Sequence, residues 1–187
     1  NYPVGTGNVA LGDTALDSIQ SGGNYNAAVG RNSLTATTTG DNNTGMGNAT
    51  LATNSTGGNN TAVGGNALEN ATTANDNTAV GYAALNSNTT GASITAVGME
   101  ALLSNTTANS NTAVGKAALR TVTTGTENVA VGVHALYNST SSYNTVMGSE
   151  AGVTNTTGGN NTFIGRRSGY NDTSGANCTA VGYQALY

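Results

Sequence analysis

The segment Asn77–Ser93 reads NTAVGYAALNSNTTGAS, and close variants of this 17-residue unit follow one another along the chain. Its Gly81 belongs to a set of glycines that recur at a nearly fixed interval. These anchor glycines are Gly12, Gly30, Gly47, Gly64, Gly81, Gly98, Gly115, Gly132, Gly148, Gly165 and Gly182. Their spacings are 18 residues, then six of 17, one of 16 and two of 17. A fixed period of this size is the signature of a repeat architecture, so it decides the fold class before any other motif.

Residues around the anchor glycines form columns when the repeats are aligned. The residue before each glycine is large and apolar, and this valine column includes Val63, Val80, Val97 and Val114. The leucine column lies four residues after the glycine and includes Leu68, Leu85, Leu102 and Leu119. The asparagine column lies four residues before the glycine and includes Asn60, Asn77 and Asn111, with Ile94 and Cys178 as exceptions. Together with Gly64, Gly81, Gly98 and Gly115, these residues are the predicted structural ladders.

Two short strands per repeat are predicted. The β-branched residues that alternate before the glycine favour one strand, and the Ala-Leu segment after it favours a second. The anchor glycine turns the chain between them, using backbone angles that a Cβ would forbid, and the Thr-Thr-Gly-x-Asn stretch forms the return turn. Residues 1–187 are then a single all-β domain, a parallel β-solenoid or β-roll of about eleven rungs and, at ~4.8 Å per rung, roughly 50 Å long.

The valine and leucine columns are predicted to line the inside of this coil. The threonine column, three residues before each anchor glycine, is expected to pack on the same side as the valine column, because residues two apart in a strand share a face. Stacked asparagine amides are expected to bond to their neighbours above and below.

One region is expected to depart most from the regular coil. The leucine column fails at Gly152 and Gly169, and Phe163 fills a position that is small in most other repeats. The stretch 148–169 therefore carries the largest changes in side-chain volume.

Composition argues against a thick core. Aromatic residues are 5% of the chain, charged residues are 7%, and glycine numbers 27. One rung offers about one Val, one Leu and some Ala, at about 1.5–3 kcal/mol for each large side chain buried. This opposes about 1–2 kcal/mol of backbone entropy for each ordered residue. The weak balance predicts a homo-oligomer, in which copies bury an apolar face against one another.

Charge and hydropathy exclude some partners. Five Lys and Arg over eleven rungs cannot form a stripe that tracks phosphates, so nucleic-acid binding is not expected. No apolar run reaches the length of a membrane span, so membrane insertion by this segment is not expected. The chain opens at Asn1-Tyr2-Pro3 without Met or a signal-like segment, which predicts an excerpt of a longer protein. A single cysteine, Cys178, leaves the compartment undecided.

The recurring Asn-Thr-Ala-Val-Gly resembles the Ser-Val-Ala-Ile-Gly motif of YadA-like heads in trimeric autotransporter adhesins. The resemblance touches every repeat, and implies a left-handed parallel β-roll, a homotrimer and an extracellular place on a bacterial cell surface. Stretches such as Gly182–Leu186 are also similar to phage tail-fibre-like surface proteins, which would place the chain on a virion. The family repeat is usually shorter, so this chain carries extra residues in a turn, and Thr mostly replaces the first Val of the motif.

No catalytic, cofactor or metal site is predicted. The single histidine, His134, lies in the variable part of a repeat, and Cys178 has no nearby His or cation in sequence. The acidic residues fall at different repeat positions and do not stack into a calcium ladder. An enzyme is therefore not expected.

The residues just after the anchor glycines vary from rung to rung, so we expect them to be exposed. The candidate ligand contacts are Tyr82, Tyr137, Arg166, Arg167, Tyr170 and Tyr183, facing a host-surface glycan or protein. The predicted function is a non-enzymatic extracellular fibre segment, a rigid spacer and adhesive surface of a bacterial adhesin or phage tail-fibre-like protein. The alternative is an ice- or matrix-binding β-solenoid that uses Thr and Asn arrays, such as Thr72-Thr73 and Thr89-Thr90 in the return turns.

Overall fold

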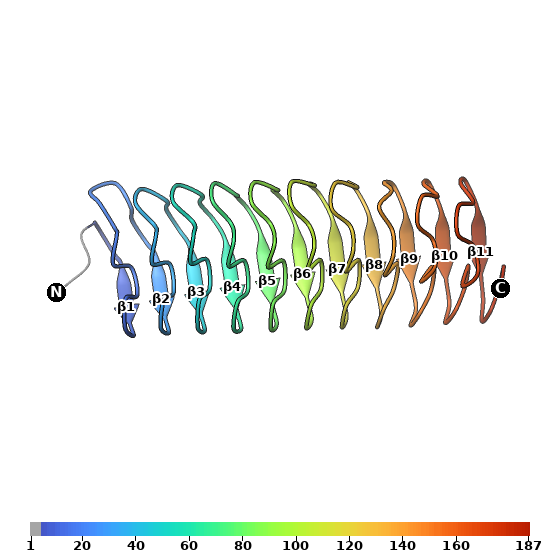
Figure 1. Cartoon of the computed structure of the whole chain (residues 1–187), viewed down its shortest axis with the longest axis horizontal. Helices are drawn as coiled ribbons and strands as arrows, with labels where there is room; N and C mark the ends of the chain where they lie inside the picture. The colour runs from blue at the N-terminus through green and yellow to red at the C-terminus, as the bar shows by residue number, and fades with distance from the viewer. Residues whose placement is uncertain (1–4) are drawn as a thin grey trace.

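A computed structural model of the protein describes residues 5–187, and the opening Asn1-Tyr2-Pro3 lies outside this part. The described chain is a β-solenoid with one short strand per rung and its two ends at opposite ends of a rod (Figure 1). The strands are β1 (Val9–Leu11), β2 (Ala27–Val29), β3 (Thr44–Met46), β4 (Thr61–Val63), β5 (Thr78–Val80), β6 (Thr95–Val97), β7 (Thr112–Val114), β8 (Val129–Val131), β9 (Thr145–Met147), β10 (Thr162–Ile164) and β11 (Thr179–Val181). The predicted all-β parallel solenoid is confirmed.

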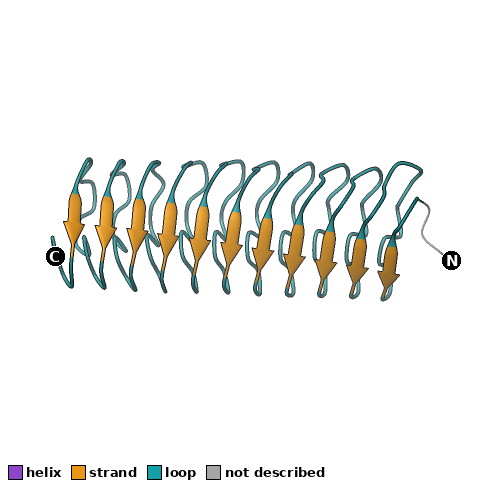
Figure 2. Cartoon of the chain, turned by 180° about the vertical axis from the view of Figure 1, so that it is seen from behind, coloured by secondary structure: helices purple, strands orange, loops and turns teal. Residues whose placement is uncertain are grey.

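All strands belong to one parallel sheet, in which each strand pairs with the next in sequence order. The strands lie side by side along one face of the rod (Figure 2). Register is direct, so that Thr78 pairs with Thr95 and Val80 with Val97. The 18-residue repeat between Gly12 and Gly30 and the 16-residue repeat between Gly132 and Gly148 both keep this register, because β1 pairs with β2, and β8 with β9, at equivalent residues.

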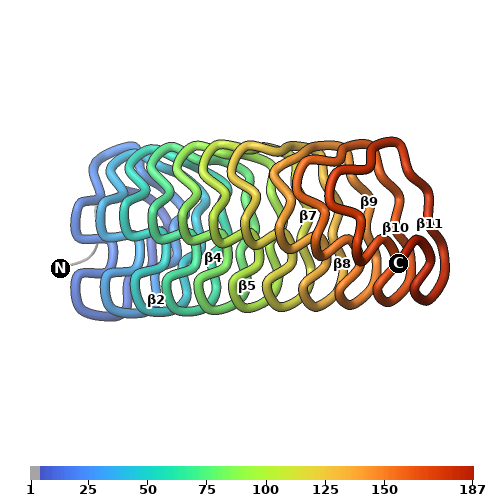
Figure 3. The backbone as a smooth tube through the Cα atoms, turned by 45° about the vertical axis from the view of Figure 1, so that its right-hand side comes forward, coloured from blue at the N-terminus to red at the C-terminus, as the bar shows by residue number. Residues whose placement is uncertain are grey.

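The irregular spacings are absorbed in the return turn. An asparagine-column side chain donates to a turn carbonyl 14 residues later in a standard rung, as Asn26 does to Gly40. The same bond spans 15 residues from Asn8 to Gly23 and 13 residues from Asn128 to Ser141. One residue is thus added or removed at an exposed turn, and the rungs stack with one outline along the rod (Figure 3).

The second strand predicted around Ala-Leu is not formed. Ala83 and Leu85 have φ angles of 53° and 54°, in the left-handed region and far from an extended strand. The amide of Ala84 donates to the carbonyl of Gly81, and that of Asn88 to Leu85, which closes two successive turns. Rung-to-rung bonding nevertheless persists, since the amide of Leu85 donates to the carbonyl of Ala101 at 2.9 Å.

The sides of the strand are the reverse of the prediction. The residue two before each anchor glycine points inward, and Ala62, Ala79 and Ala96 are fully buried. The valine and threonine columns therefore point outward, on the same face as each other but not inside the coil. The leucine column, buried at Leu68 and Leu85, fills the interior opposite the strand, so little more than a methyl group fits on the strand's inner side.

The coil interior is packed by matched volumes. At Gly169 an added Cβ would lie 2.7 Å from the ring of Phe163, and at Gly152 it would lie 3.0 Å from that ring. Phe163 therefore occupies the space that leucines fill in other rungs. The backbone keeps φ angles of 56° and 63° at the two glycines, and β9 and β10 pair in register. The expected departure from the regular coil between residues 148 and 169 is therefore wrong.

The asparagine ladder is confirmed. The Oδ1 of Asn60 accepts from the backbone amide of Asn77, and its Nδ2 donates to the carbonyl of Ala74 at 2.7 Å. The anchor glycines are also required by contact. Gly81 has a φ of 134°, and a Cβ there would lie 2.6 Å from the carbonyl of Gly98.

Candidate functional site

The turn half of a rung is the segment that follows its anchor glycine, and the candidate ligand contacts lie on the outside of this segment. Tyr137 and Tyr170 stand five residues after their anchor glycines, and Arg166, Arg167 and Tyr183 stand one or two residues after theirs. Tight turns at these positions turn the leucine side chain inward and leave its neighbours outside. We call the set Arg120, Tyr137, Arg166, Arg167, Tyr170 and Tyr183 the aromatic–cationic strip.

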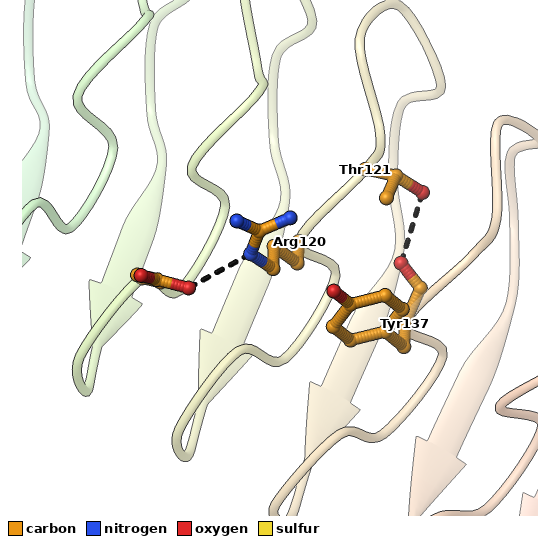
Figure 4. Close-up of polar contacts among 4 residues, drawn as sticks. Arg120, Thr121 and Tyr137 are labelled. Atoms are coloured by element: carbon orange, nitrogen blue, oxygen red, sulfur yellow. Dashed lines mark hydrogen bonds and ion pairs between the residues drawn. The ribbon is translucent and has the colours of Figure 1, made fainter.

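Arg120 links two rungs at one end of the strip. Its Nε donates to Oε2 of Glu100 at 2.8 Å, and both side chains are 30% exposed. The guanidinium carbon lies 5.8 Å from the centre of the Tyr137 ring (Figure 4). The pKa of Arg120 is raised above the ordinary value, chiefly by the hydrogen bond to Glu100. Thr121 fixes the next rung, because its hydroxyl donates to the carbonyl of Tyr137 at 2.9 Å.

Arg167 repeats this arrangement nearer the C-terminus. Its Nε donates to Oε2 of Glu150 at 2.5 Å, and its guanidinium carbon lies 5.1 Å from the centre of the Tyr170 ring. The hydrogen bond from Arg167 lowers the pKa of Glu150. Tyr170 stacks on Tyr187 with ring centres 5.4 Å apart. Each arginine is therefore held between a carboxylate and a ring.

Arg166 differs from its neighbour. Its guanidinium carbon lies 5.9 Å from the ring centre of Tyr183, which is 64% exposed, and Arg166 is exposed as well. Across residues 5–187 the ion pairs involve only Arg120 and Arg167. Arg166 thus presents an unpaired cation beside an exposed aromatic ring.

The structure separates one predicted contact from the others. Tyr82 is 60% exposed and stands beside Gly65, where an added Cβ would meet its ring at 3.7 Å. No cation or second ring contacts Tyr82 among the described residues. Glu100, Glu150 and Tyr187 also contact strip residues and were not predicted from the sequence. The available signal for the two glutamates was the presence of opposite charges about one repeat apart in the sequence, such as Glu100 and Arg120, which are 20 residues apart.

The outward side of the strands is a second surface, which we call the sheet face. It consists of the threonine and valine columns from β1 to β11. The exposed fraction is 48% at Met46, 36% at Val114, 45% at Met147 and 38% at Ile164. The sheet face therefore carries an apolar stripe along the whole rod.

The remaining reactive groups form no cluster. Within residues 5–187, no three His, Cys, Asp or Glu side chains come together as a metal site, and no helix could cross a membrane. His134 meets the ring of Tyr137 edge-on at 5.4 Å. Cys178 is half-buried and lines an open cavity of about 290 Å³ at the C-terminal end of the coil, with Asp172 and Leu186.

Comparisons with known proteins give no relative for this chain. No protein-family model matches it, and no curated protein or solved structure is significantly similar to it.

Proposed function

We propose that this chain is a non-enzymatic segment of an extracellular fibre, a rigid spacer that also presents an adhesive surface. Its parent would be a trimeric bacterial adhesin or a phage tail-fibre-like protein, on a bacterial cell surface or a virion. The observation that carries the proposal is the unbroken rod of in-register rungs with an exposed apolar stripe along one side.

Rigidity follows from hydrogen bonds on both halves of every rung. In the strand half the amide of Thr78 donates to the carbonyl of Ile94 at 2.8 Å, and in the turn half Leu85 donates to Ala101. The return turn adds the hydroxyl of Thr72, which donates to the carbonyl of Thr89 at 3.1 Å. Because each half of a rung is tied to its neighbour, no hinge interrupts the described rod.

The sheet face supports self-association. A contiguous apolar stripe on a rod of small residues marks an interaction surface, because water-exposed apolar area costs roughly 25 cal/mol per Å². The stripe repeats with the rungs, so a second copy of the rod offers a matching stripe of the same length. The resemblance to YadA-like heads, in which three chains surround one axis, makes a homotrimer the expected assembly.

Sedimentation of the purified chain tests the assembly. The wild type is expected to run as a folded trimer, and a variant with Val80→Asp and Val97→Asp as a folded monomer, because both side chains point outward. A variant with Tyr82→Ser, outside the sheet face, should remain trimeric. A stable folded wild-type monomer would contradict the proposal.

Ice binding is the second candidate function, and it uses the same face. The hydroxyls of Thr61, Thr78 and Thr95 make no hydrogen bond to other described residues, and they repeat at the strand spacing of ~4.8 Å. The first threonine of most turn pairs is less available, since the hydroxyls of Thr72, Thr89, Thr106 and Thr156 already donate to a carbonyl of the next rung. A freezing-hysteresis assay separates the candidates, because a face buried in a trimer cannot meet ice.

A further inference from the structure

We propose that the aromatic–cationic strip binds an acidic polysaccharide, an extended sugar chain that carries carboxylate or sulfate groups. This rests on the adhesive role proposed above and names the ligand chemistry of that surface. The strip draws its residues from the rungs of β7, β8, β10 and β11.

Charge is segregated onto the strip. The chain carries a net charge of −4, yet three of its five cations, Arg120, Arg166 and Arg167, belong to the strip. Two carboxylates, Glu100 and Glu150, form ion pairs with strip arginines. Three cations against two carboxylates leave the strip net positive on a negative protein, which favours an anionic ligand.

The arginines keep donors available for such a ligand. Arg120 contacts Glu100 through Nε, and its two terminal nitrogens point away from that bond (Figure 4). Arg167 likewise contacts Glu150 through Nε alone. A guanidinium binds carboxylate or sulfate in fork geometry through paired N–H groups. The carboxylates therefore position the arginines without using their full donor capacity.

The tyrosines suit the sugar rings between the anionic groups. Tyr137, Tyr170 and Tyr183 each have an arginine guanidinium within 6 Å of the ring centre, which orders the ring before any ligand arrives. Ordered aromatic side chains lose little entropy on binding. Rungs repeat at ~4.8 Å, so the tyrosines, which follow β8, β10 and β11, offer ring surfaces at intervals of one and two rungs along an extended sugar chain.

The N-terminal half of the rod provides matched controls. Arg31 and Arg166 both follow an anchor glycine directly and are both exposed, but only Arg166 lies over a tyrosine. Tyr82 and Tyr183 also share this position, with 60% and 64% exposure, and only Tyr183 has an arginine beside it. The substitutions in each pair change charge or size equally.

Titration of the assembled protein at low salt tests the inference with three probes: polygalacturonate, dextran sulfate and uncharged dextran. We expect binding to an acidic probe and none to dextran; the stronger acidic probe identifies carboxylate or sulfate as the recognised group. Arg166→Gln should weaken this binding about tenfold, the usual loss for a charge-assisted hydrogen bond. Arg31→Gln should leave it unchanged. Tyr183→Ala should weaken it, and Tyr82→Ala should not.

Two results would overturn the inference: acidic probes that bind no better than dextran, or equal losses from Arg31→Gln and Arg166→Gln, which indicate diffuse charge attraction. Sedimentation of the same samples keeps this outcome apart from that of the proposed fibre. A trimer that binds no acidic probe refutes the strip alone, whereas a monomer that binds with the expected arginine selectivity supports the strip and refutes the trimer.

Discussion

The packing of Phe163 gives the sharpest test of the coil interior. This ring is fully buried and lies where leucine side chains stand in other rungs, because its neighbours Gly152 and Gly169 have no side chain. Truncation by Phe163→Ala would leave a cavity with no side chain positioned to fill it. We expect a loss of about 3–5 kcal/mol in the free energy of unfolding.

Restoring the leucines should recover part of that loss. Each leucine introduced by Gly152→Leu or Gly169→Leu gains about 1.5–3 kcal/mol of burial, against about 1–2 kcal/mol for a left-handed backbone. The triple variant should therefore be more stable than Phe163→Ala by about 1.5 kcal/mol in total. Gly169→Leu alone should instead destabilise by about 1–3 kcal/mol, since its Cβ would meet the Phe163 ring at 2.7 Å.

Urea unfolding of the wild type and these variants measures the coupling. Leucine substitutions that stabilise the Phe163→Ala chain and destabilise the wild type confirm that the side chains compete for one volume. Additive effects, or a loss below about 1 kcal/mol for Phe163→Ala, would refute the shared cavity.

Gly98→Ala should lower stability by about 3 kcal/mol or more, because φ is 132° and the new Cβ would lie 2.5 Å from the carbonyl of Gly115. Gly65→Ala is the control, with an expected change within about 0.5 kcal/mol in urea unfolding; equal effects would contradict the contact argument. The pair of Glu150 and Arg167 should make stability pH-dependent. Because the folded pKa of Glu150 is lowered, the pair stabilises the fold above the usual carboxyl pKa of about 4.3 and loses this as pH falls through the folded value. Arg167→Gln should thus lower the melting temperature at pH 7 but not at pH 2, and an equal difference at both pH values would speak against the ion pair.

The repeat period, the strand before each anchor glycine and the asparagine ladder could all be predicted from the sequence, because each is set by residues within one unit. The inward side of the strand could not be read from alternation alone. Alternation places Thr78 and Val80 on one face of the strand and Ala79 on the other. Which face is buried depends on Leu85, whose side chain fills the interior opposite the strand. The small residue found at the Ala79 position in most repeats was the available signal, since a thin coil admits only a small side chain opposite Leu85.

The turn half was mispredicted for a related reason. Leucine favours neither a tight turn nor a left-handed backbone, so its φ of 54° at position 85 is imposed by stacking against the next rung. The candidate site was found in part. Aromatic and basic residues marked the strip, whereas Glu100 and Glu150 join it through contacts between rungs that local sequence does not display.

The central claim is that the sheet face points outward and joins copies of the rod. Oxidative cross-linking of single-cysteine variants tests it most directly, in a chain with Cys178→Ser. Val97→Cys should form covalent oligomers and be shielded from maleimide by the assembly, whereas Ala96→Cys, inside the coil, should form no cross-link and should react with maleimide only after the protein is unfolded. Cross-links through Ala96→Cys, or a Val97→Cys thiol that maleimide modifies freely and that forms no cross-link, would contradict the account.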